Sequence, residues 1–87
     1  MRRVYKYEVT GDLVRVKHKA KFLHFGCQNG TWQSWFEIDT DEYGDDLVML
    51  KVVGTGHDIP DGMTHLASTI DGNFVWHLYK GNDQWIT

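Results

Sequence analysis

The chain has 87 residues, twelve of them aromatic, and a net charge of −3. This length provides for one hydrophobic core, so we expect a single domain over residues 1–87. Its apolar stretches are far shorter than the ~20 residues that cross a bilayer, and the lone Cys27 excludes an internal disulfide, so we expect a cytoplasmic protein.

The first segments alternate apolar and polar residues with a period of two, which is typical of strands. Residues 3–9 and residues 13–18 both show this alternation, and residues 10–12 read Thr-Gly-Asp, a common turn composition. We therefore expect the two strands to pair as a hairpin.

The middle of the chain contains the strongest hairpin signal. Residues 21–28 are apolar enough for a central strand, the pair Asn29-Gly30 tolerates positive φ, and residues 32–39 return as the next strand. Residues 40–46 are polar and rich in carboxylates, which predicts an exposed loop. Residues 47–53 form an aliphatic run that we expect to be buried on both faces.

The last third begins with an irregular connection. Residues 54–62 contain three glycines and the only proline, so regular structure is excluded there. Residues 63–70 predict a strand with a possible helical turn at its centre, Asp71-Gly72 predicts a turn, and residues 74–80 predict the final strand. About seven short strands predict an all-β fold, either an antiparallel β-sandwich or a small barrel.

The charged residues are unevenly distributed along the chain. The first 24 residues hold seven basic and two acidic side chains, a net charge of +5, and the remainder holds two basic and ten acidic ones, a net charge of −8. Four of the basic residues occupy alternate positions: Arg15, Lys17, Lys19 and Lys21. On one strand face they would form an anion-binding stripe with phosphate-like spacing, and the alternative is a solvated face. The overall acidic balance argues against direct nucleic-acid binding.

Six carboxylates gather in an acidic segment, residues 37–46. They are Glu37, Asp39, Asp41, Glu42, Asp45 and Asp46. Their spacing lacks the pattern of a calcium-binding loop. The alternatives are a solvated loop and a patch that docks on the basic groove of a partner, with Trp32, Trp35 and Trp85 as candidate anchors.

Histidine and cysteine patterns give no catalytic or metal motif. The five histidines lack the close pairs of zinc motifs, although His65 and His77 fall on adjacent predicted strands. His57 beside Asp58 has no recognisable nucleophile or phosphate loop with it. We therefore expect structural histidines, no metal, no cofactor and no enzyme. Cys27 is expected to be a small buried residue, with an intermolecular disulfide as the alternative.

Four motifs in this order resemble a family of small uncharacterised proteins from tailed phages and prophages. The motifs are RVYKYEV at 3–9, FLHFGCQNG at 22–30, VVGTGHDIPDG at 52–62 and FVWHLY at 74–79. The glycine-rich loop and the final strand are the most distinctive, and Asp58 departs from the family pattern, in which an uncharged residue, often proline, stands there. The resemblance implies an accessory protein in the cytoplasm of the bacterial host, with an anti-defence role such as anti-CRISPR activity.

Two functional hypotheses follow from these observations. The first is a non-enzymatic protein, monomeric or homodimeric, that binds and inhibits a host protein or nucleoprotein complex that handles nucleic acid. The alternative is a small-molecule-binding module that acts as a sponge for a signalling nucleotide, using the basic residues or the loop of residues 54–62.

Overall fold

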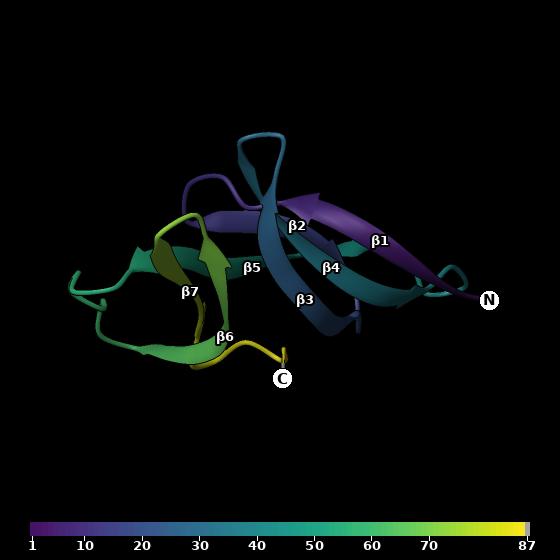
Figure 1. Cartoon of the computed structure of the whole chain (residues 1–87). Helices are drawn as coiled ribbons and strands as arrows, with labels where there is room; N and C mark the ends of the chain where they lie inside the picture. The colour runs from purple at the N-terminus through teal and green to yellow at the C-terminus, as the bar shows by residue number, and fades with distance from the viewer. Residues whose placement is uncertain (87) are drawn as a thin grey trace.

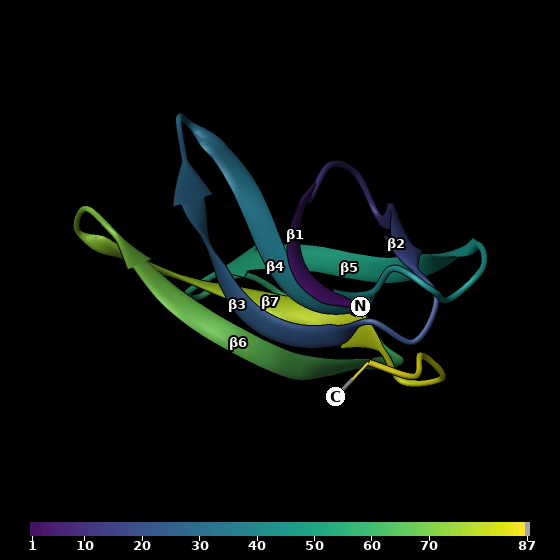
Figure 2. The same cartoon turned by 90° about the vertical axis from the view of Figure 1, so that its right-hand side faces the viewer.

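The structure, a computed structural model, describes residues 1–86 as seven antiparallel strands in two layers (Figure 1, Figure 2). They are β1 (Arg2–Glu8), β2 (Leu13–Lys17), β3 (Lys21–Gln28), β4 (Thr31–Asp39), β5 (Asp45–Gly54), β6 (Met63–Asp71) and β7 (Phe74–Gly81). One sheet has the order β1-β4-β3 and the other the order β2-β5-β7-β6. The predicted all-β fold is confirmed, and its form is a small sandwich. Among the described residues no helix could span a membrane.

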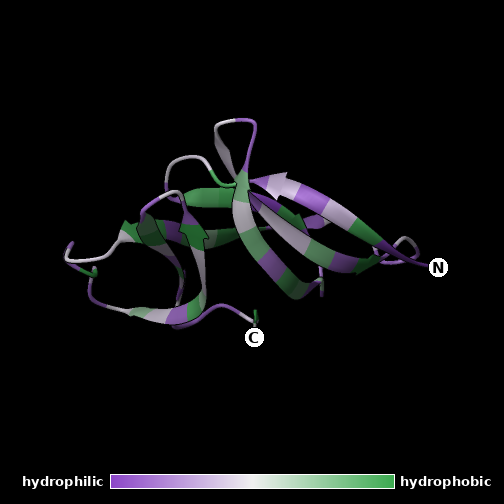
Figure 3. Ribbon diagram, in the orientation of Figure 1, coloured by the Kyte–Doolittle hydropathy of each residue, from purple (hydrophilic) through white to green (hydrophobic). Residues whose placement is uncertain are grey.

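The core lies between the two sheets and receives side chains from both. Figure 3 shows hydrophobic and hydrophilic bands alternating along the strands, as expected for sheets with one buried face. The fully buried members are Val16, Phe25, Phe36, Ile38, Val48, Leu50, Leu78 and Ile86. Ile86 follows the last strand, so the C-terminal tail is anchored in the core.

Two of the three predicted hairpins are present. β3 and β4 are joined at Asn29 and Gly30, whose φ angles are 54° and 80°. Two successive residues with positive φ are typical of the tight turns that match strand twist. β6 and β7 are joined by a turn that includes Gly72, with φ of 61°.

The predicted pairing of the first two strands is wrong. β1 pairs with β4, and β2 pairs with β5, so the two strands lie in different sheets. Turn residues between them allow the chain to cross from one layer to the other. In this arrangement Val14 and Val16 are buried between the sheets, a result that local alternation cannot distinguish from side-by-side pairing.

Three further expectations need correction. β5 is not buried on both faces: Leu47 and Met49 are 53% and 41% exposed, because the outer face of its sheet is open to solvent. The acidic loop is shorter than predicted, since Asp45 and Asp46 belong to β5. Residues 66–68 form no helical turn but part of β6, with a β-bulge at Leu66.

Candidate ligand-binding cavity at the β2–β3 turn

The connection between β2 and β3 is a tight turn with an unusual residue. The N–H of Ala20 donates to the carbonyl of Lys17 at 3.1 Å, and Lys19, the third residue of this turn, has a φ of 61°. Positive φ at the third position is typical of a type II turn, which normally places glycine there. A side chain in this conformation costs about 1–2 kcal/mol, and such strain is concentrated at functional sites.

Two buried side chains hold the walls of the site. Ala20 is buried between the exposed residues Lys19 and Lys21, which fixes the turn against the core. Ile86 is fully buried, which places the preceding residue, Trp85, at the surface with 36% exposure. Two distant segments of the chain therefore face each other.

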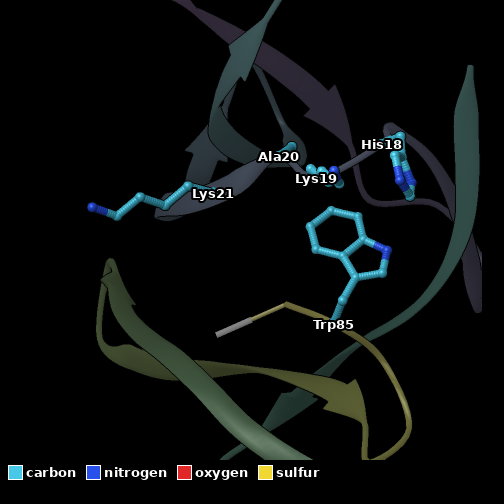
Figure 4. Close-up of a pocket in the computed structure, with 5 residues that line it drawn as sticks. All are labelled: His18, Lys19, Ala20, Lys21 and Trp85. Carbon is cyan, nitrogen blue, oxygen red and sulfur yellow. The ribbon is translucent and has the colours of Figure 1, made fainter. Parts of the chain in front are cut away.

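The space between these segments is a cavity of about 450 Å³. It is lined by His18, Lys19, Ala20, Lys21 and Trp85. Figure 4 shows the indole of Trp85 facing the turn, while the Lys21 side chain extends away from the indole. The volume is within the range of small-molecule sites, about 300–1,000 Å³. The cavity therefore combines a flat apolar surface, from Trp85, with the cationic groups of Lys19 and Lys21.

Acidic residues contact two of the three basic groups at the cavity. His18 Nδ1 lies 2.7 Å from Asp46 Oδ2, and Lys19 Nζ lies 3.8 Å from Glu42 Oε1. Lys21 forms no ion pair with a carboxylate of residues 1–86. An anion can therefore reach the Lys21 ammonium directly, and it reaches Lys19 by replacing Glu42.

The predicted basic stripe is not a continuous strand face. Arg15 and Lys17 lie on β2, Lys19 lies in the turn, and Lys21 lies on β3 of the other sheet. β2 ends at Lys17 because the chain must cross between the layers. The structure instead brings Lys19 and Lys21 together with Trp85, for which the sequence predicts only a protein-binding role.

The first half of the acidic segment is paired with cations. Asp39 and Asp41 lie 2.9 and 3.0 Å from the ammonium of Met1, and Glu37 lies 3.7 Å from Arg2. The N–H of Asp41 donates to the Asp39 carboxylate, and this bond with that from Met1 lowers the pKa of Asp39. The same carboxylates, Asp39 first, raise the pKa of the Met1 ammonium.

The second half of the acidic segment is also next to basic residues. Glu42 and Asp46 contact the cavity wall as described above, and Asp45 lies opposite Lys17 in the β2–β5 ladder. The six carboxylates therefore form a surface of mixed charge. This differs from the uncompensated negative patch that the sequence pattern predicts.

The other two candidate tryptophan anchors are packed against neighbours. Trp32 is partly buried, with ring-centroid distances of 5.1 Å to Phe25 and 5.4 Å to Trp76. Trp35 lies on the outer face of the three-stranded sheet, 5.3 Å from the His24 ring. Trp32 therefore contributes to packing between the sheets, while Trp35 does not line the cavity.

Several functional features were missed by sequence reasoning. Tyr43 is 94% exposed within the acidic segment. The sequence feature that could have indicated it is a single aromatic residue among carboxylates. Nothing in the sequence indicated the left-handed backbone of Lys19, because no glycine or asparagine marks that turn. Cys27 is exposed, contrary to the expectation of burial.

The loop after β5 is explained by packing. The N–H of His57 donates to the carbonyl of Gly54 at 3.0 Å, and the His57 ring packs edge-on against Trp76 at 6.4 Å. Within residues 1–86, no group of three or more His, Cys, Asp or Glu side chains is placed to hold a metal ion.

Comparison with known proteins gives one match. Residues 1–86 match the family described as "Domain of unknown function (DUF7352)". No curated protein and no solved structure shows significant similarity to the chain.

Proposed function

We propose that this chain, which belongs to the family of domains of unknown function DUF7352, is a non-enzymatic module that binds a nucleotide. The observation that carries this proposal is the cavity between the β2–β3 turn and Trp85. The resemblance of the sequence motifs to tailed-phage proteins implies the cytoplasm of a phage-infected host. There such a module would act by sequestering a signalling nucleotide.

The chemistry of the cavity matches the two parts of a nucleotide. The indole of Trp85 offers a flat surface on which a base can stack, an interaction worth about 1–3 kcal/mol per base. Lys19 and Lys21 offer ammonium groups for phosphate oxygens, and ammonium–phosphate contacts are strong charge-assisted hydrogen bonds. The strained backbone of Lys19 supports a role for this side chain beyond the fold.

Nucleotide titration followed by thermal unfolding and calorimetry tests the proposal. The panel contains mononucleotides, cyclic dinucleotides and inorganic phosphate. A ligand at 100 times its Kd stabilises the folded state by about 2.7 kcal/mol. Trp85→Leu should lower nucleotide affinity and leave the weaker phosphate affinity unchanged. Trp35→Leu, the same substitution on β4, is the matched control.

Two results would contradict nucleotide binding at this site. One is an unfolding midpoint that no member of the panel raises at millimolar concentration. The other is a Trp85→Leu variant with wild-type nucleotide affinity, which would place the ligand elsewhere.

A second candidate function is inhibition of a host nucleic-acid-handling complex, as in anti-CRISPR activity. The observation that favours it is Tyr43, an almost fully exposed aromatic side chain beside Glu42 in the acidic segment. Aromatic anchors that become buried on binding dominate many protein interfaces.

Capture of a nucleic-acid-handling complex from a bacterial lysate tests this second function. Tyr43→Ala should abolish capture without changing the circular dichroism spectrum, and Tyr5→Ala on β1 is the control. Reversal of Asp41, Glu42, Asp45 and Asp46 to Lys should have the same effect. Capture that survives both changes would exclude the acidic segment as the interface.

A further inference from the structure

The outer face of the four-stranded sheet carries a chain of side-chain hydrogen bonds between β6 and β7. His65 Nε2 lies 2.7 Å from Ser68 Oγ, and Ser68 Oγ lies 2.7 Å from His77 Nδ1. His77 Nε2 in turn lies 3.0 Å from Thr55 Oγ1, which donates to the carbonyl of Val75 at 2.9 Å. None of the residues in this series of hydrogen bonds lines the cavity at the β2–β3 turn.

The hydroxyl groups determine the direction of this chain. Thr55 has one hydroxyl proton and gives it to Val75, so its oxygen accepts from the N–H at His77 Nε2. In the neutral ring, His77 Nδ1 then carries a lone pair, to which Ser68 donates. The Ser68 oxygen accepts from His65 Nε2. Two imidazole nitrogens are therefore directed at one oxygen atom.

We propose that His65, Ser68 and His77 bind a divalent transition-metal ion of the class that prefers imidazole, with Zn²⁺ as the probe. Imidazole nitrogen is a common ligand of zinc, copper and nickel. Tetrahedral zinc with bonds of about 2.0–2.1 Å holds its ligand atoms about 3.3 Å apart. The two N···O distances of 2.7 Å need to open by about 0.6 Å, and the two imidazole rings, whose centroids lie 6.1 Å apart, need to turn toward the ion.

Binding needs two changes in the ligands. His65 must move its proton to Nδ1 so that its Nε2 lone pair faces the ion, and this side chain is exposed, so solvent can exchange that proton. His77 keeps its tautomer, because Nδ1 is already the unprotonated nitrogen, but the Ser68 O–H that donates to Nδ1 must turn away to free the lone pair. Ser68 can supply its oxygen, and water can complete the coordination on the solvent side.

Thr55 supports the site from behind. A histidine that binds a metal usually donates its other N–H to a neighbouring acceptor, which fixes the ring and its tautomer. Thr55 supplies that acceptor for His77 and is itself held by the β7 backbone. The ring of His65 packs edge-on against Tyr79 at 5.5 Å, which restricts its rotation. Because only two histidines and one hydroxyl hold the metal ion, we expect it to exchange readily with ions in solution.

Calorimetric titration of the full chain with Zn²⁺, together with Co²⁺ absorption spectra, tests the proposal. We expect one ion per chain and a tetrahedral Co²⁺ spectrum. His65→Ala should lower affinity at least about tenfold, and Thr55→Val, which keeps both histidines, should lower it about tenfold. Since His77 is partly buried, His77→Asn is the second ligand variant.

Matched controls separate this site from other metal-binding groups. His24 lies on the outer face of the other sheet, and Cys27 is the exposed thiol. His24→Ala and Cys27→Ser should bind Zn²⁺ as the wild type does. The proposal is overturned if the wild type leaves Zn²⁺ unbound at millimolar concentration, or if His65→Ala and His77→Asn keep wild-type affinity.

Discussion

The hydroxyl of Tyr7 accepts a hydrogen bond from the backbone N–H of Lys17 at 3.2 Å. Tyr7 belongs to β1 and Lys17 to β2, so this bond joins the two sheets. The Tyr7 ring also packs edge-on against Phe36 in the core, with centroids 5.7 Å apart. The two strands that were expected to form a hairpin are thus connected face to face through a side chain.

Tyr7→Phe should lower the free energy of unfolding by about 1 kcal/mol at neutral pH, because a partly buried hydrogen bond is lost. Tyr5→Phe, on the same strand, is the control and should change little. Urea unfolding of both variants measures the difference, and equal stability of Tyr7→Phe and wild type would contradict the role of this bond.

The Tyr7 hydroxyl also predicts a pH dependence. Burial raises the pKa of Tyr7 above its ordinary value of 10.0. The folded state therefore holds this proton more tightly than the unfolded state does, and the stabilisation is complete below pH 10 and lost as the pH rises through the folded pKa. Unfolding curves between about pH 8 and 11 should show a steeper loss in wild type than in Tyr7→Phe.

Gly54→Ala should destabilise the protein by about 1–3 kcal/mol through overpacking. A Cβ atom at Gly54 would lie 2.9 Å from the His57 ring and 3.0 Å from the ring of Trp76. Because His57 is the closer neighbour, the double variant Gly54→Ala/His57→Ala should recover part of the loss. Chemical unfolding of the single and double variants measures this coupling, and simple additivity would contradict the contact.

Lys19→Gly should stabilise the fold and weaken nucleotide binding. Glycine adopts positive φ without steric cost, so Lys19→Gly should be about 1 kcal/mol more stable than Lys19→Ala. Both variants lack the ammonium group and should bind nucleotide more weakly than wild type. Retained affinity in both would remove Lys19 from the site, and equal stability would show that the turn is unstrained.

Glu42→Gln should raise the affinity for a phosphate-bearing ligand about two- to fivefold. The Glu42 carboxylate competes for Lys19, and exposed ion pairs of this kind contribute about 0.2–1 kcal/mol. Asp41→Asn removes the same charge but contacts Met1 instead. Calorimetric titration compares the two variants. An equal rise in both would indicate a general charge effect, with no competition at Lys19.

Patterns of neighbouring residues in the sequence predict much of the secondary structure. Alternating side chains identify the first two strands, because a half-buried sheet imposes a period of two on its sequence, and apolar runs between turn signals identify others. Asn29-Gly30 identifies the hairpin turn through its tolerance of positive φ. Both signals depend only on neighbouring residues, which is why they can be found without a structure.

The candidate site depended on information that is absent from local sequence. Lys19 adopts its left-handed backbone because β2 and β3 lie in different layers, a consequence of strand pairing over long distances. Trp85 reaches the cavity because Ile86 is buried in the core. His65 and His77 converge on Ser68 through a register that includes a β-bulge.

The sequence by itself determined an all-β chain, the approximate bounds of its strands, its two hairpin turns and the separation of basic from acidic residues. Only the tertiary structure decided which strands share a sheet, which charges neutralise one another and which distant side chains meet. The physical reason is that the alternation of apolar and polar residues along a strand indicates only which residues face a core. Its partners depend on how all the strands together bury their apolar faces.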